Sequence, residues 1–126
     1  MVKKIALGVL IVLLLGGAWW QNTYIKGATE RLTTLLGDVQ RALDEDDFDA
    51  AVVAADEFSA QWKKEKQVYE ALIDHDDIDL ISATTARMKS YCDTRFREGA
   101  LAETHALLFY VRHLKDIDTI GWENIF

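Results

Sequence analysis

The chain has 126 residues, a net charge of −7 and no proline at all. Average proline usage is about 5%, so its absence favours long helices joined by short links. From residue 21 onward, 12 Lys and Arg (14 less Lys3 and Lys4) stand against 21 Asp and Glu, a net charge of −9. Phosphate backbones repel such an acidic region, so we expect no nucleic-acid partner. The single cysteine, Cys92, excludes an intramolecular disulfide and a multi-thiolate metal site.

Residues 5–20 form an uninterrupted run of apolar or small side chains. As a helix this run would span about 24 Å, slightly less than a hydrocarbon core of ~30 Å. The charged and aromatic residues that flank it are Lys3, Lys4, Trp19 and Trp20. Lysine and tryptophan favour the interfaces of a bilayer, where they extend the reach of a short span. We therefore predict a transmembrane signal anchor over residues 1–22, in contact with membrane lipid through residues 5–20.

A cleaved signal peptide is the main alternative, because Gly16-Gly17-Ala18 offers small residues at a suitable cleavage site. The two tryptophans that follow directly argue against cleavage. A buried core helix is a third interpretation, but the run has no polar face. Since a positively charged N-terminus stays in the cytoplasm, we expect a single-pass protein of the cell membrane with its helical domain outside the cytoplasm. Lys26 and Arg31, beyond the run, weaken this charge bias.

The remaining sequence has the periodicity of amphipathic helices. Apolar or small side chains recur every three or four residues from Ile25 to Ala42, which places them on one helix face. Further along, side chains spaced one heptad apart are Phe48, Ala55, Trp62 and Tyr69. Acidic residues lie between the periodic segments, where they can cap the helices that follow. The predicted helices cover about 23–44, 47–73, 77–93 and 96–115.

These segments predict an all-α fold: an N-terminal transmembrane helix followed by a four-helix bundle of two stacked helical hairpins. The domain division is 1–22 for the anchor and 23–126 for the acidic helical domain. A weak repeat at an offset of 48 residues aligns Phe48-Asp49-Ala50-Ala51-Val52 with Phe96-Arg97-Glu98-Gly99-Ala100. An aromatic followed by small residues resembles the turn of tetratricopeptide hairpins. A four-helix arrangement would bury all the apolar faces at once.

Four stretches of the chain share the order and spacing of one family. They are Asp74-His75-Asp76-Asp77-Ile78-Asp79, Ala86-Arg87-Met88-Lys89-Ser90-Tyr91, Ala100-Leu101-Ala102-Glu103 and Glu123-Asn124-Ile125-Phe126. They resemble a family of small single-pass membrane proteins from spore-forming, Gram-positive-type bacteria, which is defined by a domain of unknown function. The resemblance implies the anchored helical architecture and no particular activity. Leu114-Lys115 departs from the proline that the family shows after the residue matching His113, and this departure bears on where the fourth helix ends.

The acidic and histidine cluster at residues 74–79 is the strongest candidate for a ligand site. His75, Asp76 and Asp77 carry side chains that are ordinary ligands of divalent metals. The competing interpretation is a helix-to-helix turn, in which acidic residues cap the next helix and interact favourably with its dipole. We predict no metal and no cofactor, and keep these three residues as candidate ligands.

Other titratable residues give no motif by their spacing. His105 and His113 lie eight residues apart and form neither an HExxH motif nor an i, i+4 ligand pair. They could join Glu103 and His75 only through tertiary structure. Cys92 stands at helical spacing from Met88 and is interpreted as a core residue. The acidic run 44–49 is interpreted as a solvated turn.

The sequence contains no glycine-rich phosphate loop, no G-x-S-x-G elbow and no paired cysteines. We therefore expect a non-enzymatic, membrane-anchored helical protein that serves as a protein-interaction or structural module at the cell envelope. Its protein partner is not identified by the sequence. In the purely structural version, the anchor itself associates with other transmembrane helices. The alternative is a metal-binding or enzymatic domain that uses the cluster at residues 74–79.

Overall fold

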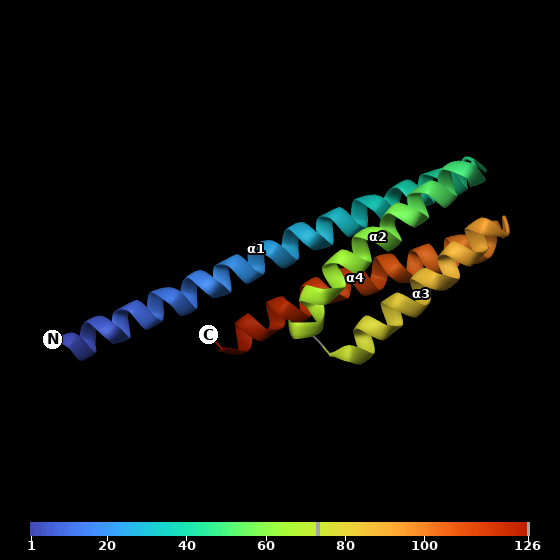
Figure 1. The fold of residues 1–126 in the computed structure, drawn as a ribbon. Helices are drawn as coiled ribbons and strands as arrows, with labels where there is room; N and C mark the ends of the chain where they lie inside the picture. Colours follow the sequence, from blue (N-terminus) through green and yellow to red (C-terminus); the bar gives the residue numbers. More distant parts are fainter. Residues whose placement is uncertain (73, 126) are drawn as a thin grey trace.

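Four helices make up nearly the whole chain (Figure 1). This computed structural model describes residues 1–72 and 74–125, with side chains except at residues 22, 72 and 115–125. The helices are α1 Val2–Asp44, α2 Phe48–Leu72, α3 His75–Asp93 and α4 Arg97–Ile125. No strand occurs within the described ranges. The predicted all-α fold class is therefore confirmed.

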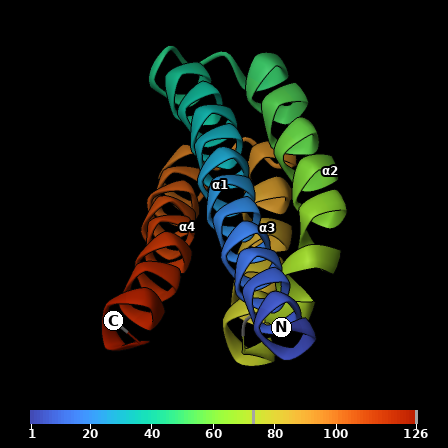
Figure 2. The ribbon, with the colours of Figure 1, turned by 90° about the vertical axis from the view of Figure 1, so that its left-hand side faces the viewer.

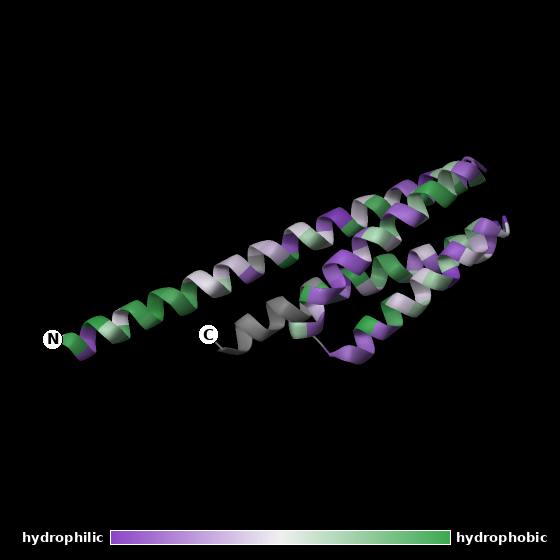
Figure 3. Ribbon diagram, viewed as in Figure 1, coloured by the Kyte–Doolittle hydropathy of each residue, from purple (hydrophilic) through white to green (hydrophobic). Residues whose placement is uncertain are grey.

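The first helix, α1, joins the predicted anchor and the first predicted bundle helix into one segment of 43 residues. Its length is about 65 Å at 1.5 Å per residue. Neither proline nor a charged interruption separates the two predicted segments, so the backbone hydrogen bonds continue from one into the other. The apolar first half of α1 projects beyond the other helices, as Figure 3 shows by its hydrophobic colouring. The division at residue 22 thus corresponds to no break in the helix and stays a prediction.

The helices pack in a ring in which each contacts two neighbours (Figure 2). Helix α1 contacts α2 and α4, and α3 contacts the same two helices from the other side. The chain reverses direction at each link, so the α1–α2 and α3–α4 links lie together at the end of the bundle far from the N-terminus (Figure 1). This arrangement turns one face of every helix toward a common interior.

The interior is filled by the side chains that the periodicity selects. Spacings of three and four residues bring apolar groups onto one stripe of each helix, and burial of that stripe drives the packing. The largest fully buried apolar or aromatic side chains are Tyr69, Phe58, Ile25, Leu32, Leu36, Leu43, Ile78, Ile81, Met88, Leu107 and Leu114. All four helices contribute to this one core.

The links after α1 and after α3 have the same backbone geometry. After α1, the amide of Asp46 donates to the carbonyl three residues back (3.1 Å) and the amide of Asp47 to the carbonyl five residues back (2.9 Å). After α3, Arg95 and Phe96 make the same two bonds, at 3.2 and 2.9 Å. The first residue of each pair is left-handed, with φ of 55° at Asp46 and 58° at Arg95. Both links are therefore Schellman motifs, which satisfy the last carbonyls of a helix.

This geometry changes the predicted internal repeat. The two turns match with Asp46 opposite Arg95, an offset of 49 residues (95 less 46) rather than 48. The sequence alignment paired the two phenylalanines, but Phe48 is the first residue of α2 whereas Phe96 precedes α4. The two turns correspond in backbone conformation, and an alignment of their aromatic side chains does not detect this correspondence.

Two helix boundaries differ from the prediction. Helix α3 begins at His75 rather than at 77, because Asp74 takes the N-cap position. Helix α4 continues to Ile125 rather than ending near 115, because no proline follows His113 to interrupt the backbone hydrogen bonds. The predicted end of the second helix at residue 73 and the chain end at Phe126 lie outside the described residues.

The left-handed conformation at Arg95 yields a test by paired substitutions. Because alanine pays a steric cost of ~1 kcal/mol there that glycine avoids, we expect Arg95→Gly to be about 1 kcal/mol more stable than Arg95→Ala. Both variants lose the side-chain contacts of Arg95, so their difference isolates the backbone term. The measurement is urea unfolding of the full chain in a mild detergent, followed by circular dichroism.

Thr94 is the matched control, because its φ of −88° is negative and alanine can adopt it without a steric cost. At that position we expect the opposite order, with Thr94→Ala at least as stable as Thr94→Gly. The same order of glycine and alanine at both positions would contradict the assigned turn.

Candidate functional site

The cluster at residues 74–79 acts locally as a helix cap. Asp74 is extended, and its carboxylate oxygen Oδ1 accepts a hydrogen bond of 3.1 Å from the amide of Asp76. Asp76 and Asp77 lie in the first turn of α3, where negative charge interacts favourably with the helix dipole. The His75 side chain is exposed. Asp74, Asp76 and Asp77 thus have structural roles that require no ligand.

The other candidate ligands lie apart along α4 and are engaged by other groups. The Glu103 carboxylate forms an ion pair of 3.2 Å with Arg87 of α3. The ring of His113 stacks against Phe109 with 6.4 Å between centroids. His105 is exposed. Within the described part of the chain, no three His, Cys, Asp or Glu side chains come together in a group that could hold a metal ion.

The acidic turn after α1 meets two arginines of the turn after α3. The Arg97 guanidinium Nε donates to the Leu43 carbonyl (3.0 Å) and lies 3.3 Å from a carboxylate oxygen of Asp46. Arg95 pairs with Asp49 at 3.4 Å. The predicted solvated turn is therefore also a contact between the two links, and Arg97 satisfies a carbonyl at the end of α1.

A buried polar cluster lies between α1 and α2. The Glu65 side chain is only 2% exposed, and its Oε1 accepts hydrogen bonds from Arg31 Nε (3.1 Å) and Gln61 Nε2 (2.8 Å). Its second oxygen, Oε2, has no hydrogen-bond partner within the described residues, and the same holds for the hydroxyls of Thr29 and Tyr69. A charge buried this deeply needs its partner, so Arg31 holds α1 and α2 in register at this level.

Burial makes two side chains resistant to ionisation. Desolvation, with a smaller contribution from the Glu65 charge, raises the pKa of Tyr69 to about 12. Thr29 lies close enough to oppose this rise, although its hydroxyl and that of Tyr69 do not meet in a well-formed hydrogen bond. Burial, followed by the charges of Asp93 and Asp56, raises the pKa of Cys92 to about 11. The Cys92 thiol is therefore a core group and not an activated nucleophile.

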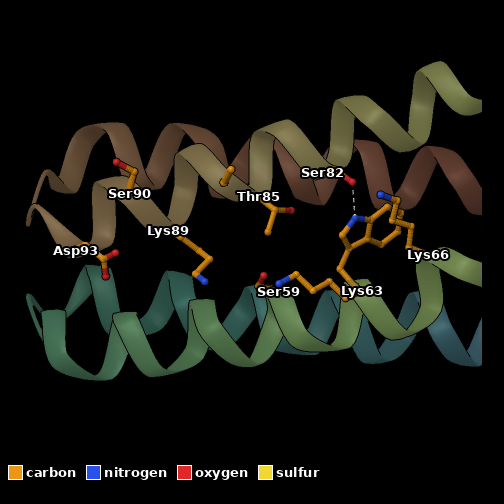
Figure 4. A pocket seen from close by; sticks show the side chains of 10 residues that line it. Ser59, Lys63, Lys66, Ser82, Thr85, Lys89, Ser90 and Asp93 are labelled. Atoms are coloured by element: carbon orange, nitrogen blue, oxygen red, sulfur yellow. Dashed lines mark hydrogen bonds between the residues drawn. The ribbon is translucent and has the colours of Figure 1, made fainter.

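A groove with a volume of about 470 Å³ lies between α2 and α3 (Figure 4). Its lining comes from about two turns of α2 and about three turns of α3, and it includes three lysines and four hydroxyls. The lining residues are Ser59, Trp62, Lys63, Lys66, Ser82, Thr85, Ala86, Lys89, Ser90 and Asp93. We call this feature the lysine groove. Its size falls in the range of ~300–1,000 Å³ that is usual for binding sites.

The floor of the lysine groove is fixed by packing and hydrogen bonds. The Trp62 indole, only 2% exposed, donates from Nε1 to Ser82 Oγ across the two helices at 3.0 Å, the dashed line in Figure 4. The Thr85 hydroxyl donates to the carbonyl of Ile81 at 2.7 Å. Ser59 is 8% exposed and faces the same hollow. The apolar and hydroxyl floor is thus buried and hydrogen-bonded, whereas the lysines around it are more exposed.

The charges of the lysine groove are only loosely neutralised. Lys89 pairs with Asp56 at 3.2 Å and Lys66 with Glu70 at 3.7 Å, and all four side chains are at least one-third exposed. Lys63 has no carboxylate within 4.0 Å among the described side chains. Exposed ion pairs of this kind contribute little to stability, so a ligand carboxylate can replace them at small cost.

Sequence reasoning did not find the lysine groove. Its cations come from the run Lys63-Lys64-Glu65-Lys66 on α2 and from Lys89 on α3, two segments with no common motif. The available signal was the helical phase: Lys63 and Lys66 stand on one flank of Trp62, and Lys64 does not line the groove. Only the pairing of α2 with α3 adds Lys89 to them.

The comparisons with known proteins give one match. The sequence model of the family described as "Domain of unknown function (DUF4363)" covers residues 19–125, so the apolar residues before Trp19 fall outside it. No curated protein and no solved structure matches the chain.

The raised pKa of Tyr69 predicts a loss of stability in alkali. Tyr69 ionises near pH 10 when unfolded but near 12 when folded, so its contribution is complete below pH 10 and is lost as the pH rises toward 12. At 1.36 kcal/mol per pH unit, the loss reaches about 3 kcal/mol. We expect Tyr69→Phe to flatten the decline of unfolding free energy between pH 9 and 12, measured by urea titration.

The control is Tyr91→Phe, which removes the hydroxyl of a half-buried tyrosine on α3. It should retain the alkaline decline of the wild type. Equal pH profiles for Tyr69→Phe and the wild type would show that this hydroxyl does not resist ionisation.

Proposed function

This chain belongs to the DUF4363 family, and we propose that it is a single-pass membrane protein whose helical domain is a protein-interaction module at the cell envelope. One observation carries the proposal: an exposed apolar helix continues without a break into a packed bundle. All residues from 5 to 20 except Ala18 are exposed, and Leu13 and Leu14 are 66% and 64% exposed. By length and composition it can cross a membrane, and the apolar window is 0% buried.

The flanks of the segment support the proposed anchor. Lys3 and Lys4 precede it, and Trp19 and Trp20 close it at 70% and 62% exposure. The Trp20 ring stacks on Tyr24 with 5.8 Å between centroids, which forms an aromatic pair at the level expected for a bilayer interface. The N-terminal lysines favour a cytoplasmic N-terminus and a bundle outside.

We also propose that the bundle consists of two stacked hairpins, α1–α2 and α3–α4, with tetratricopeptide-like turns. The shared Schellman geometry at Asp46 and Arg95 supports this division. The arginine contacts from the second turn to Asp46 and Asp49 hold the hairpins together at one end. Helical hairpins stacked in this way present extended surfaces, which suits a module that binds other proteins.

A substitution at the centre of the apolar segment tests the anchor. We expect Leu13→Arg in the tagged full chain to shift a large share of the protein out of the membrane fraction, since arginine at a span centre costs ~2.5–3.5 kcal/mol. Leu13→Met, which keeps the apolar character, should stay in the membrane pellet after alkaline carbonate extraction.

Two other outcomes would overturn the proposal. Release of the wild-type chain in soluble form, with the mass of a chain that begins near Trp19, would identify residues 1–18 as a cleaved signal.

An exchange of residues 5–20 for an unrelated apolar span tests which part of the chain binds the partners. Retention of crosslinked partners would assign them to the helical domain, and their loss would favour the purely structural version in which the anchor itself associates.

A further inference from the structure

The lysine groove gathers cationic side chains on a strongly acidic domain. From residue 21 onward the sequence carries a net charge of −9, yet the groove brings together Lys63, Lys66 and Lys89, with the carboxylate of Asp93 also in its lining. Lys63 has no carboxylate within 4.0 Å among the described side chains, whereas Lys66 and Lys89 hold exposed ion pairs with Glu70 and Asp56. A carboxylate ligand therefore meets one unpaired lysine and two lysines whose exposed partners it can replace.

The groove also offers hydrogen-bond donors at its floor. Hydroxyls of Ser59, Ser82 and Ser90 face it, and a serine hydroxyl can donate to a carboxylate while it accepts from another group, as Ser82 does from Trp62. Lysine ammonium groups supply charge without fixed geometry. Such a set suits several carboxylates spaced along a chain better than a single planar ligand.

The length of the groove fits a short peptide. Along α3 the lining runs from Ser82 to Asp93, about 16 Å of helix at 1.5 Å per residue. An extended segment of about five residues covers that distance at ~3.3 Å each. Trp62, at the floor, adds an apolar surface for one side chain of such a segment.

We propose that the lysine groove binds an acidic, carboxylate-rich segment of the partner protein. This inference rests on the proposed interaction function and names the kind of partner that it requires. Charge complementarity carries it: Lys63, Lys66 and Lys89 converge here, and the carboxylates that pair with Lys66 and Lys89 are exposed enough for a bound carboxylate to replace them. The negative charge of Asp93 lies at one end of the groove, so the two ends differ in charge and one direction of the bound segment is favoured.

The chain provides a matched control for this groove. Lys63 and Lys64 are adjacent exposed lysines on α2, but only Lys63 lines the groove. The test variant is Lys63→Gln with Lys89→Gln, and the control is Lys64→Gln with Lys26→Gln, which changes the net charge equally. Each full chain is placed in nanodiscs of neutral phosphatidylcholine, and binding of a fluorescent ten-residue glutamate-rich peptide is followed by anisotropy at low and moderate salt.

We expect the wild type and the control to bind equally and the groove variant to bind at least tenfold more weakly. Equal weakening in both variants, or no binding by the wild type, would overturn the inference. Stronger binding to phosphatidylglycerol vesicles, or full displacement of the peptide by millimolar inorganic phosphate, would also overturn it, in favour of a lipid or a phosphate ligand.

Photocrosslinking in cells separates this inference from the proposed function. A photoreactive residue is placed at Ala86, which is exposed and lines the groove, or at Ala83, which is exposed on the same helix outside it. The inference predicts an adduct on an acidic stretch of a partner from position 86 alone. A partner captured from other surfaces, or equally by the groove variant, would refute the groove and leave the interaction module in place. No partner from any position would refute the proposed function itself.

Discussion

The inner face of α1 is the constraint on which the rest of the structure depends. Its buried side chains from Ile25 to Leu43 pack against α2 on one side and against α4 on the other. Without α1, the apolar stripes of both helices would face water, and the bundle would lose the element that closes its ring. The proposed anchor and the proposed interaction module therefore share helix α1, and neither is an appendage of the other.

A second constraint acts on the same interface. The nearly fully buried Glu65 carboxylate of α2 is held by Arg31 of α1, and loss of Arg31 would leave an unpaired charge in the interior. A polar pair of this kind adds little net stability but penalises any slip of α2 along α1. Since Lys63 and Lys66 flank Glu65, the same register decides where these lysines emerge on the other side of α2. The buried pair thus positions the exposed groove.

Periodicity predicted most of the core and little of the site. The heptad positions Ala55, Trp62 and Tyr69 are buried, because an amphipathic stripe determines which side faces the interior. The burial of Glu65 was not predicted, because a charged residue within a lysine run indicates a solvated helix face. Its spacings of three residues from Trp62 and four from Tyr69 nevertheless place it on the buried face. The repeat offset was wrong by one residue because a Schellman turn is defined by a left-handed backbone, which neither Asp46 nor Arg95 signals as glycine would. The lysine groove depends on which helices pair, and local sequence does not report this.

The position of the groove follows from the ring of helices. Helix α3 lies diagonally opposite α1 in this ring, and the α2–α3 groove opens on a side where no residue of α1 lines it. Residues 21–44 of α1 extend about 36 Å from the end of the apolar segment to the paired turns. With residues 5–20 embedded as proposed, the groove runs lengthwise along the wall of a short, upright bundle within that distance. A partner segment would then lie along the bundle and not across its tip, and it would be reached most easily by a protein that is itself held close to the same membrane.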